Sequence, residues 1–214
     1  MKDKLGMRIG ESFFCIGYLL FAFISSIIFL LNGSHIFIIY GIMTLILALG
    51  DSFHLVPRVI KNIKGKSKEI EFWMNLGLII TSITMTIFYI LLFYIWRILY
   101  EKEVLLNITI IIWITTISRI IICLLPQNKW FTGGNKKLSL IRNIIFLTTG
   151  LIEVILFIFL GNSYGITTGI CILLSFVFYL PVTIYGKEKP IVGMLMIPKT
   201  IMYIIIISLG LSLL

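Results

Sequence analysis

"HIFIIYGIMTLILALGDSFHLVPR", residues 35–58, joins a long apolar stretch to a short polar end. The apolar part contains no acidic or basic residue after its first position, and then Asp51, His54 and Arg58 follow within eight residues. A helix needs about 20 mostly apolar residues to cross the hydrocarbon core of a bilayer. The stretch therefore predicts a membrane-spanning helix over residues 35–57, with ionisable side chains in its final turns.

Six further stretches have the same length and apolar character, and they cover residues of about 10–31, 72–97, 104–125, 139–160, 163–184 and 190–214. Hydrophobic residues make up 59% of the chain and charged residues 13%, whereas a typical soluble domain has about a quarter of its residues charged. The mean hydropathy is +1.10. We therefore predict an all-α fold, a single polytopic membrane domain of seven transmembrane helices.

The lysines and arginines predict how these spans are oriented. Fourteen of the 18 lie in segments that would share one side of the membrane, residues 1–9, 58–71, 126–142 and 185–189. Arg97 and Lys102 lie on the other side, and two lie within spans. Because basic loops stay in the cytoplasm, we predict a cytoplasmic N-terminus and an outside C-terminus in the cytoplasmic membrane. This topology explains the net charge of +9 without a nucleic-acid partner.

Composition also bears on the source and on metal or cofactor binding. Thirteen lysines against five arginines, with isoleucine abundant, indicate an AT-rich bacterial genome. The three cysteines lie in separate spans and predict buried packing residues. His35 and His54 lie near opposite ends of one span, so they cannot share a zinc ion. We therefore expect no metal and no cofactor.

Three prolines lie near the predicted cytoplasmic ends of spans, in "HLVPR" (54–58), "CLLPQ" (123–127) and "FYLPV" (178–182). A proline just beyond a helix end is an ordinary stop signal, which favours helices that end at these points. The alternative is a kinked helix whose freed carbonyl groups line a cavity, as in transporters.

Ionisable residues inside the spans are the candidates for function. A charged side chain at the centre of a bilayer costs about 2.5–3.5 kcal/mol on insertion scales, so each needs an explanation. Spacings of three and four residues put Asp51, His54 and Arg58 on one helical face. We predict that Asp51 and His54 form a catalytic acid/base pair and that Arg58 binds an anionic head group. Simple anchoring of the helix end is the alternative.

Further polar residues are predicted to bind substrate. In "SRIIICLLPQNKW" (118–130), Arg119 lies at a depth similar to that of Asp51, which predicts an ion pair between them. Glu153 and Lys199 lie within other spans and predict a second pair. The complete set of predicted substrate-binding residues is Arg58, Arg119, Gln127, Asn128, Glu153 and Lys199.

These residues fall almost entirely in the predicted cytoplasmic half of the membrane, which favours a polar, cytoplasm-facing site. We expect a lipid or small-molecule ligand there, and the first hypothesis is a hydrolase acting on a lipid or lipid-linked substrate. A small-solute transporter is the second, although transport needs polar groups reachable from both faces. A membrane scaffold or accessory subunit without chemistry is the third. The oligomeric state stays open.

Two family resemblances bear on these hypotheses. "GIMTLILALGDSFHLVPR" (41–58), with Gly50-Asp51 and Leu55, is similar to the Gly-Asp helix of lysoplasmalogenase-like membrane proteins, and "LGLIITSITMTIFYILLF" (76–93) resembles their next helix. The resemblance implies hydrolysis of a vinyl-ether lipid by aspartates. Asp51 matches, but the later aspartate of that family is missing.

The second resemblance is to PQ-loop transporters. "LVPRVIKNIKGKS" (55–67) and "LLPQN" (124–128) resemble the proline-containing stretches of that family. The resemblance implies transport by two three-helix units around a linker helix. The two prolines here lie only two helices apart, which departs from that arrangement.

Overall fold

The protein is a bundle of seven long helices, and the computed structural model describes residues 2–101, 106–186 and 189–214. The helices are α1 (Lys2–Asn32), α2 (His35–Lys64), α3 (Lys68–Tyr100), α4 (Leu106–Leu124), α5 (Lys136–Leu160), α6 (Ser163–Tyr185) and α7 (Met196–Leu211). Two 3₁₀ segments, η1 (Pro126–Asn128) and η2 (Pro190–Leu195), precede α5 and α7. All seven spans are long and apolar enough to cross a membrane, and the described residues contain no strand. The all-α, multi-pass prediction is confirmed.

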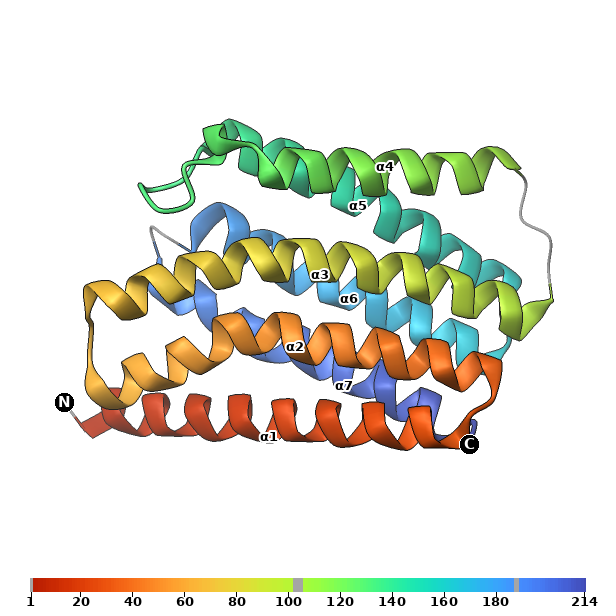
Figure 1. The fold of residues 1–214 in the computed structure, drawn as a ribbon, viewed down its shortest axis with the longest axis horizontal. Helices are drawn as coiled ribbons and strands as arrows, with labels where there is room; N and C mark the ends of the chain where they lie inside the picture. The colour runs from red at the N-terminus through yellow and green to blue at the C-terminus, as the bar shows by residue number, and fades with distance from the viewer. Residues whose placement is uncertain (1, 102–105, 187–188) are drawn as a thin grey trace.

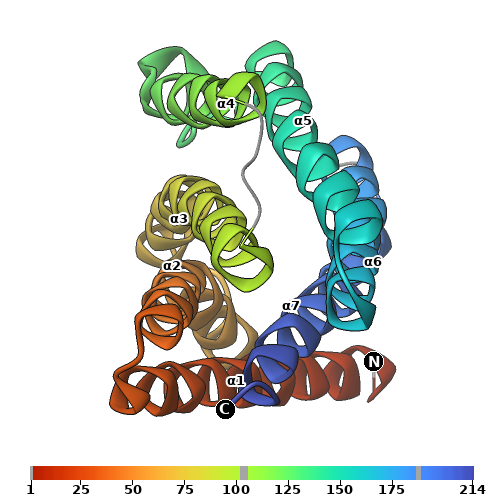
Figure 2. The same ribbon diagram turned by 90° about the vertical axis from the view of Figure 1, so that its right-hand side faces the viewer.

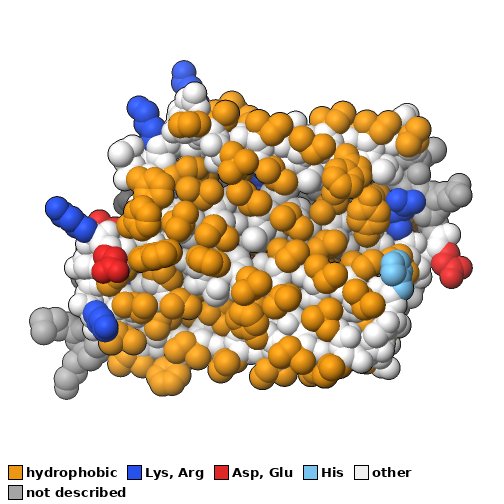
Figure 3. Space-filling view, viewed as in Figure 1, with side chains coloured by type: hydrophobic (Ala, Val, Ile, Leu, Met, Phe, Trp, Pro, Cys, Tyr) orange, Lys and Arg blue, Asp and Glu red, His pale blue; other side chains and the backbone are white. Residues whose placement is uncertain are grey.

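Successive helices run in opposite directions, so the two termini lie at opposite ends of the bundle (Figure 1). We call the end where α2 ends and α3 begins the basic end, because the lysines of residues 61–68 and 129–137 lie there. Figure 3 shows a band of hydrophobic side chains across one face, with most of the visible cations near the basic end. Lys102, Lys187 and the start of the predicted 104–125 span lie outside the described residues.

The bundle is an open arc when it is viewed along the helices (Figure 2). Each helix packs on the next one in the sequence, α7 returns to contact α1, and α3 also contacts α5. Aromatic side chains fill the space inside the arc: the ring of Tyr89 packs edge-on against Phe146, with the ring centroids 4.9 Å apart, and Phe88 packs against Tyr203 at 5.4 Å. The interior is therefore a packed core that carries tyrosine hydroxyl groups.

Two of the three predicted proline stops are wrong. Pro57 lies inside α2, which continues to Lys64, and Pro181 lies inside α6. Pro126 does follow the end of α4 and begins η1. A proline inside a helix lacks the N–H that would bond to the carbonyl four residues earlier. In α2 that carbonyl belongs to Phe53.

Small residues bring α3 close to α2 at this point. A Cβ atom placed on Gly77 would lie 2.4 Å from the carbonyl oxygen of Phe53, so the α3 backbone covers the group that Pro57 leaves unbonded. One turn further along α3, the Thr81 hydroxyl donates a hydrogen bond to the Gly50 carbonyl at 2.9 Å. Such contacts between small residues are typical of tightly packed membrane helices. They set the rotation of α2, and with it the direction of Asp51.

Candidate functional site

A buried group of polar side chains joins five helices in the core. We call it the central cluster and define it as Tyr18, Asp51, Tyr89, Arg119, Lys199 and Tyr203. All of these except Asp51 are at most 6% exposed.

Asp51 faces α1. Its carboxylate accepts a hydrogen bond from the Tyr18 hydroxyl at 2.8 Å. Two turns nearer the basic end, Arg58 forms an ion pair with Glu11 of α1, and Asn62 donates to the same carboxylate at 3.1 Å. Residues seven apart differ in direction by only about 20° on a helix, so Asp51 and Arg58 share a face. Arg58 is thus engaged in packing α2 against α1.

His54 lies on a different side of α2. Three residues leave it about 60° from Asp51 around the helix. Its Nδ1 lies 3.4 Å from the carbonyl oxygen of Met74 on α3. In the described part of the chain no hydrogen bond joins His54 to Asp51, so the predicted acid/base pair is not assembled in this structure.

Lys199 interacts electrostatically with Asp51, but the two charged groups lie more than 4.0 Å apart and form no ion pair among the described residues. Its ammonium nitrogen lies 4.9 Å from the ring centroid of Tyr179 and 5.2 Å from that of Tyr203. The predicted Glu153–Lys199 ion pair does not form among the described residues. The reason is that α6 packs between α5 and α7.

Arg119 is 3% exposed and has no carboxylate partner within the described residues. Its Nη1 donates to the Thr86 hydroxyl at 2.9 Å, and its guanidinium carbon lies 3.4 Å from the ring centroid of Phe146. Its Nε–H has no acceptor among the described residues. The predicted Asp51–Arg119 ion pair is wrong because α3 packs between α2 and α4.

Glu153 is fully buried in α5, and neither carboxyl oxygen has a hydrogen-bond partner in the described structure. It interacts electrostatically with Tyr89 of the central cluster. It is thus close enough to influence the cluster but makes no direct polar contact with it.

Asn128 caps the C-terminal end of α4. Its amide donates to the carbonyl oxygens of Leu125, at 2.8 Å, and Ile122, and its own oxygen accepts from Arg142. The Arg142 guanidinium lies over the Trp130 ring, 3.9 Å from the centroid. The amide group of Asn128 is therefore occupied by helix capping, and the Gln127 side chain is exposed.

The tyrosines of the central cluster are functional candidates that the sequence reasoning missed. Tyr203 and Tyr89 place their hydroxyl oxygens 3.5 Å apart, and Tyr89 also reaches the Ser175 hydroxyl at 3.3 Å. Tyr18 could have been found, because it lies seven residues from Glu11, the same separation as Asp51 from Arg58. Equal spacing of the two pairs predicts that a polar face of α1 lies against a polar face of α2.

The arrangement favours an anion. Lys199 interacts electrostatically with Arg119, and Asp51 is the one carboxylate in the cluster. The cluster therefore carries an excess of positive charge in a medium of low dielectric. No group of three potential metal-ligating side chains occurs in the described ranges.

Comparison of the chain with protein-family models, with curated protein sequences and with solved structures finds no match. The geometry of the central cluster is therefore the basis for the function proposed next.

Proposed function

We propose that this membrane protein binds the anionic group of a lipid or lipid-linked substrate at the central cluster and hydrolyses it. The observation that carries the proposal is that Arg119 and Lys199 are both buried while neither has a carboxylate within 4.0 Å among the described residues. Burying an uncompensated charge costs several kcal/mol. A phosphate or carboxylate placed between the two cations would offset that cost.

Arg119 is suited to such a ligand. Its planar guanidinium offers several N–H groups in a fixed geometry that matches phosphate and carboxylate oxygens. Thr86 accepts from one of these groups, and the unbonded Nε–H remains for a ligand. Lys199 adds a second cation from α7.

Within this proposal Asp51 is the catalytic acid/base. It would accept a proton from the attacking water and later donate it to the leaving group, while Tyr18 holds the carboxylate in place by its 2.8 Å hydrogen bond. The resemblance of Gly50-Asp51 to lysoplasmalogenase-like proteins supports this assignment. We give His54 a positioning role instead, because it contacts the α3 backbone.

The proposal includes the orientation of the chain. We place the basic end in the cytoplasm of a bacterial cell, so that the N-terminus is inside and the C-terminus outside. The support is the uneven distribution of lysine and arginine between alternate loops. The substrate would then enter from the cytoplasmic leaflet.

Transport of a small anionic solute is the second candidate. The observation that favours it is that Pro57 and Pro181 lie inside α2 and α6, as in helices that bend during transport. The two functions differ in outcome, because a hydrolase changes its substrate and a transporter moves it unchanged.

The test uses the full-length protein in vesicles of bacterial polar lipids, with lipid products measured by mass spectrometry. We expect a hydrolysis product from the wild-type protein, its loss in Asp51→Asn, and its retention in Ser52→Ala, where the neighbouring hydroxyl donates to the Leu49 carbonyl of its own helix. Hydrolysis at the wild-type rate by Asp51→Asn would contradict the assignment. Movement of a trapped anion across the vesicle membrane without product would favour the transporter.

A further inference from the structure

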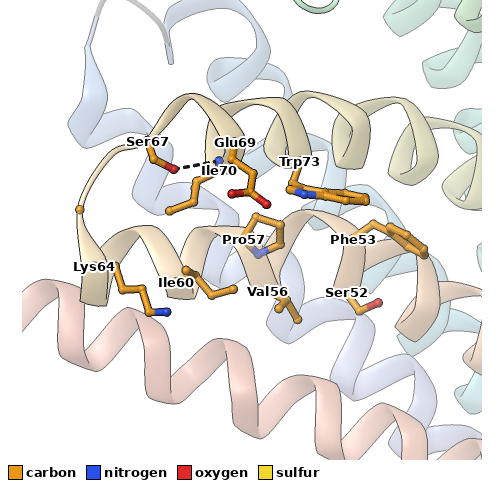
Figure 4. Close-up of a pocket in the computed structure, with 11 residues that line it drawn as sticks. Ser52, Phe53, Val56, Pro57, Ile60, Lys64, Ser67, Glu69, Ile70 and Trp73 are labelled. Atoms are coloured by element: carbon orange, nitrogen blue, oxygen red, sulfur yellow. Dashed lines mark hydrogen bonds between the residues drawn. The ribbon is translucent and has the colours of Figure 1, made fainter.

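A groove on the outside of the bundle lies between the basic end of α2 and the first turns of α3 (Figure 4). Its volume is about 640 Å³, within the usual range of about 300–1,000 Å³ for small-molecule sites. Ser52 and Phe53 line it on a different side of α2 from Asp51, which contacts α1. The groove is thus separate from the central cluster.

The wall of the groove is apolar, and its side chains face the surrounding membrane. Phe53, Val56, Ile60 and Trp73 are between 37% and 45% exposed, although all four are hydrophobic. In a spanning helix such side chains meet lipid tails. The apolar group that a bilayer supplies at this position is a lipid acyl chain.

The length of the groove matches one leaflet. Ser52 and Lys64 are twelve residues apart, which corresponds to about 18 Å along a helix. Half of the roughly 30 Å hydrocarbon core is about 15 Å. A single lipid whose head group lies at the Lys64 end would therefore extend its chain as far as Phe53.

The lining of the groove carries one charge of each sign. Lys64 and Glu69 are the charged residues that line the groove, and both are exposed. Figure 4 shows Lys64 beside Ile60 on α2 and the Glu69 carboxylate above Pro57. These two side chains form no ion pair with each other in the described structure. Each can therefore bind a separate group of one ligand.

We propose that this groove binds one phospholipid with a phosphoethanolamine head group. Lys64 contacts the phosphate, Glu69 accepts hydrogen bonds from the primary ammonium, and the acyl chain lies along Phe53, Ile60 and Trp73. Phosphatidylglycerol lacks the cation that Glu69 needs, and the trimethylammonium of phosphatidylcholine has no N–H to donate. Charge complementarity thus selects the zwitterionic lipid with N–H donors. The proposal is independent of hydrolysis at Asp51.

Native mass spectrometry of the purified full-length protein tests the proposal, with phosphatidylethanolamine, phosphatidylcholine and phosphatidylglycerol of identical chains as probes. We expect the first phosphatidylethanolamine to bind roughly two- to fivefold tighter than either other lipid, a range set by exposed charge pairs. Glu69→Gln should remove this preference, and Lys64→Gln should weaken the binding of all three lipids. Val56→Trp, which fills the groove, should lower the affinity for all three lipids further.

Matched controls separate this site from general charge effects. Glu71→Gln and Lys68→Gln change exposed neighbours that do not line the groove. Both variants should bind the three lipids with the affinity of the wild type. An equal affinity of the wild type and Glu69→Gln for phosphatidylethanolamine would overturn the proposal.

Discussion

The hydroxyl of Tyr18 on α1 donates a 2.8 Å hydrogen bond to the carboxylate of Asp51 on α2. Tyr18 is 2% exposed, so this bond lies in the core of the bundle. It fixes one carboxyl oxygen of the proposed acid/base.

The first prediction is that Tyr18→Phe lowers the free energy of unfolding by about 0.6–2 kcal/mol, the range for interhelical and charge-assisted hydrogen bonds. Unfolding in mixed detergent micelles measures it. Tyr18→Phe and Asp51→Ala should be strongly non-additive, because each removes the same bond. Additive losses in the double mutant would contradict the pairing.

The second prediction concerns Glu153, whose buried carboxyl oxygens have no partner in the described structure. Glu153→Leu keeps a similar volume and removes the unsatisfied group, so it should raise the free energy of unfolding by about 1–3 kcal/mol. Glu11→Leu is the matched control and should lower it, because Glu11 pairs with Arg58. A loss of stability in Glu153→Leu would show that its carboxyl has a partner.

The third prediction is that Gly77→Val destabilises the α2–α3 pair by about 1–3 kcal/mol, as overpacking does. The new Cβ would lie 2.4 Å from the carbonyl oxygen of Phe53, which is backbone and cannot move aside. Gly17→Val is the control, since nothing lies within 4 Å of a Cβ there. Equal unfolding midpoints for the two variants would contradict the close approach.

The fourth prediction separates helix capping from substrate binding at Asn128. Asn128→Ala should lower the free energy of unfolding by about 1–2 kcal/mol, because the carbonyl groups at the end of α4 lose their donor. Gln127→Ala, at an exposed neighbour, should have no effect. If Asn128→Ala instead changes product formation at full stability, the capping role is wrong.

Apolar length was sufficient to predict the seven helices, because a bilayer imposes a minimum length on any helix that crosses it. The proline stops failed at Pro57 and Pro181 because a neighbouring helix can cover a freed carbonyl, as Gly77 allows at Phe53. No local pattern reveals such a neighbour.

The candidate site was predicted only in part. Asp51, Arg119 and Lys199 were identified because charges are costly in a membrane, and all three belong to the central cluster. Their partners were wrong because pairing depends on which helices touch, and α3 separates Asp51 from Arg119. The buried tyrosines resembled ordinary apolar packing, so sequence alone gave them no role.

The affinity of the protein for an anionic single-chain lipid, lysophosphatidate, tests the central claim most directly. The measurement is made in a Lys64→Gln background, so that the α2–α3 groove contributes little. We predict that Lys199→Met raises the dissociation constant about tenfold or more, as loss of a charge-assisted hydrogen bond does. Lys137→Met, at the exposed basic end, should leave it unchanged. Equal dissociation constants for the Lys199→Met protein and its parent would contradict an anion site at the central cluster.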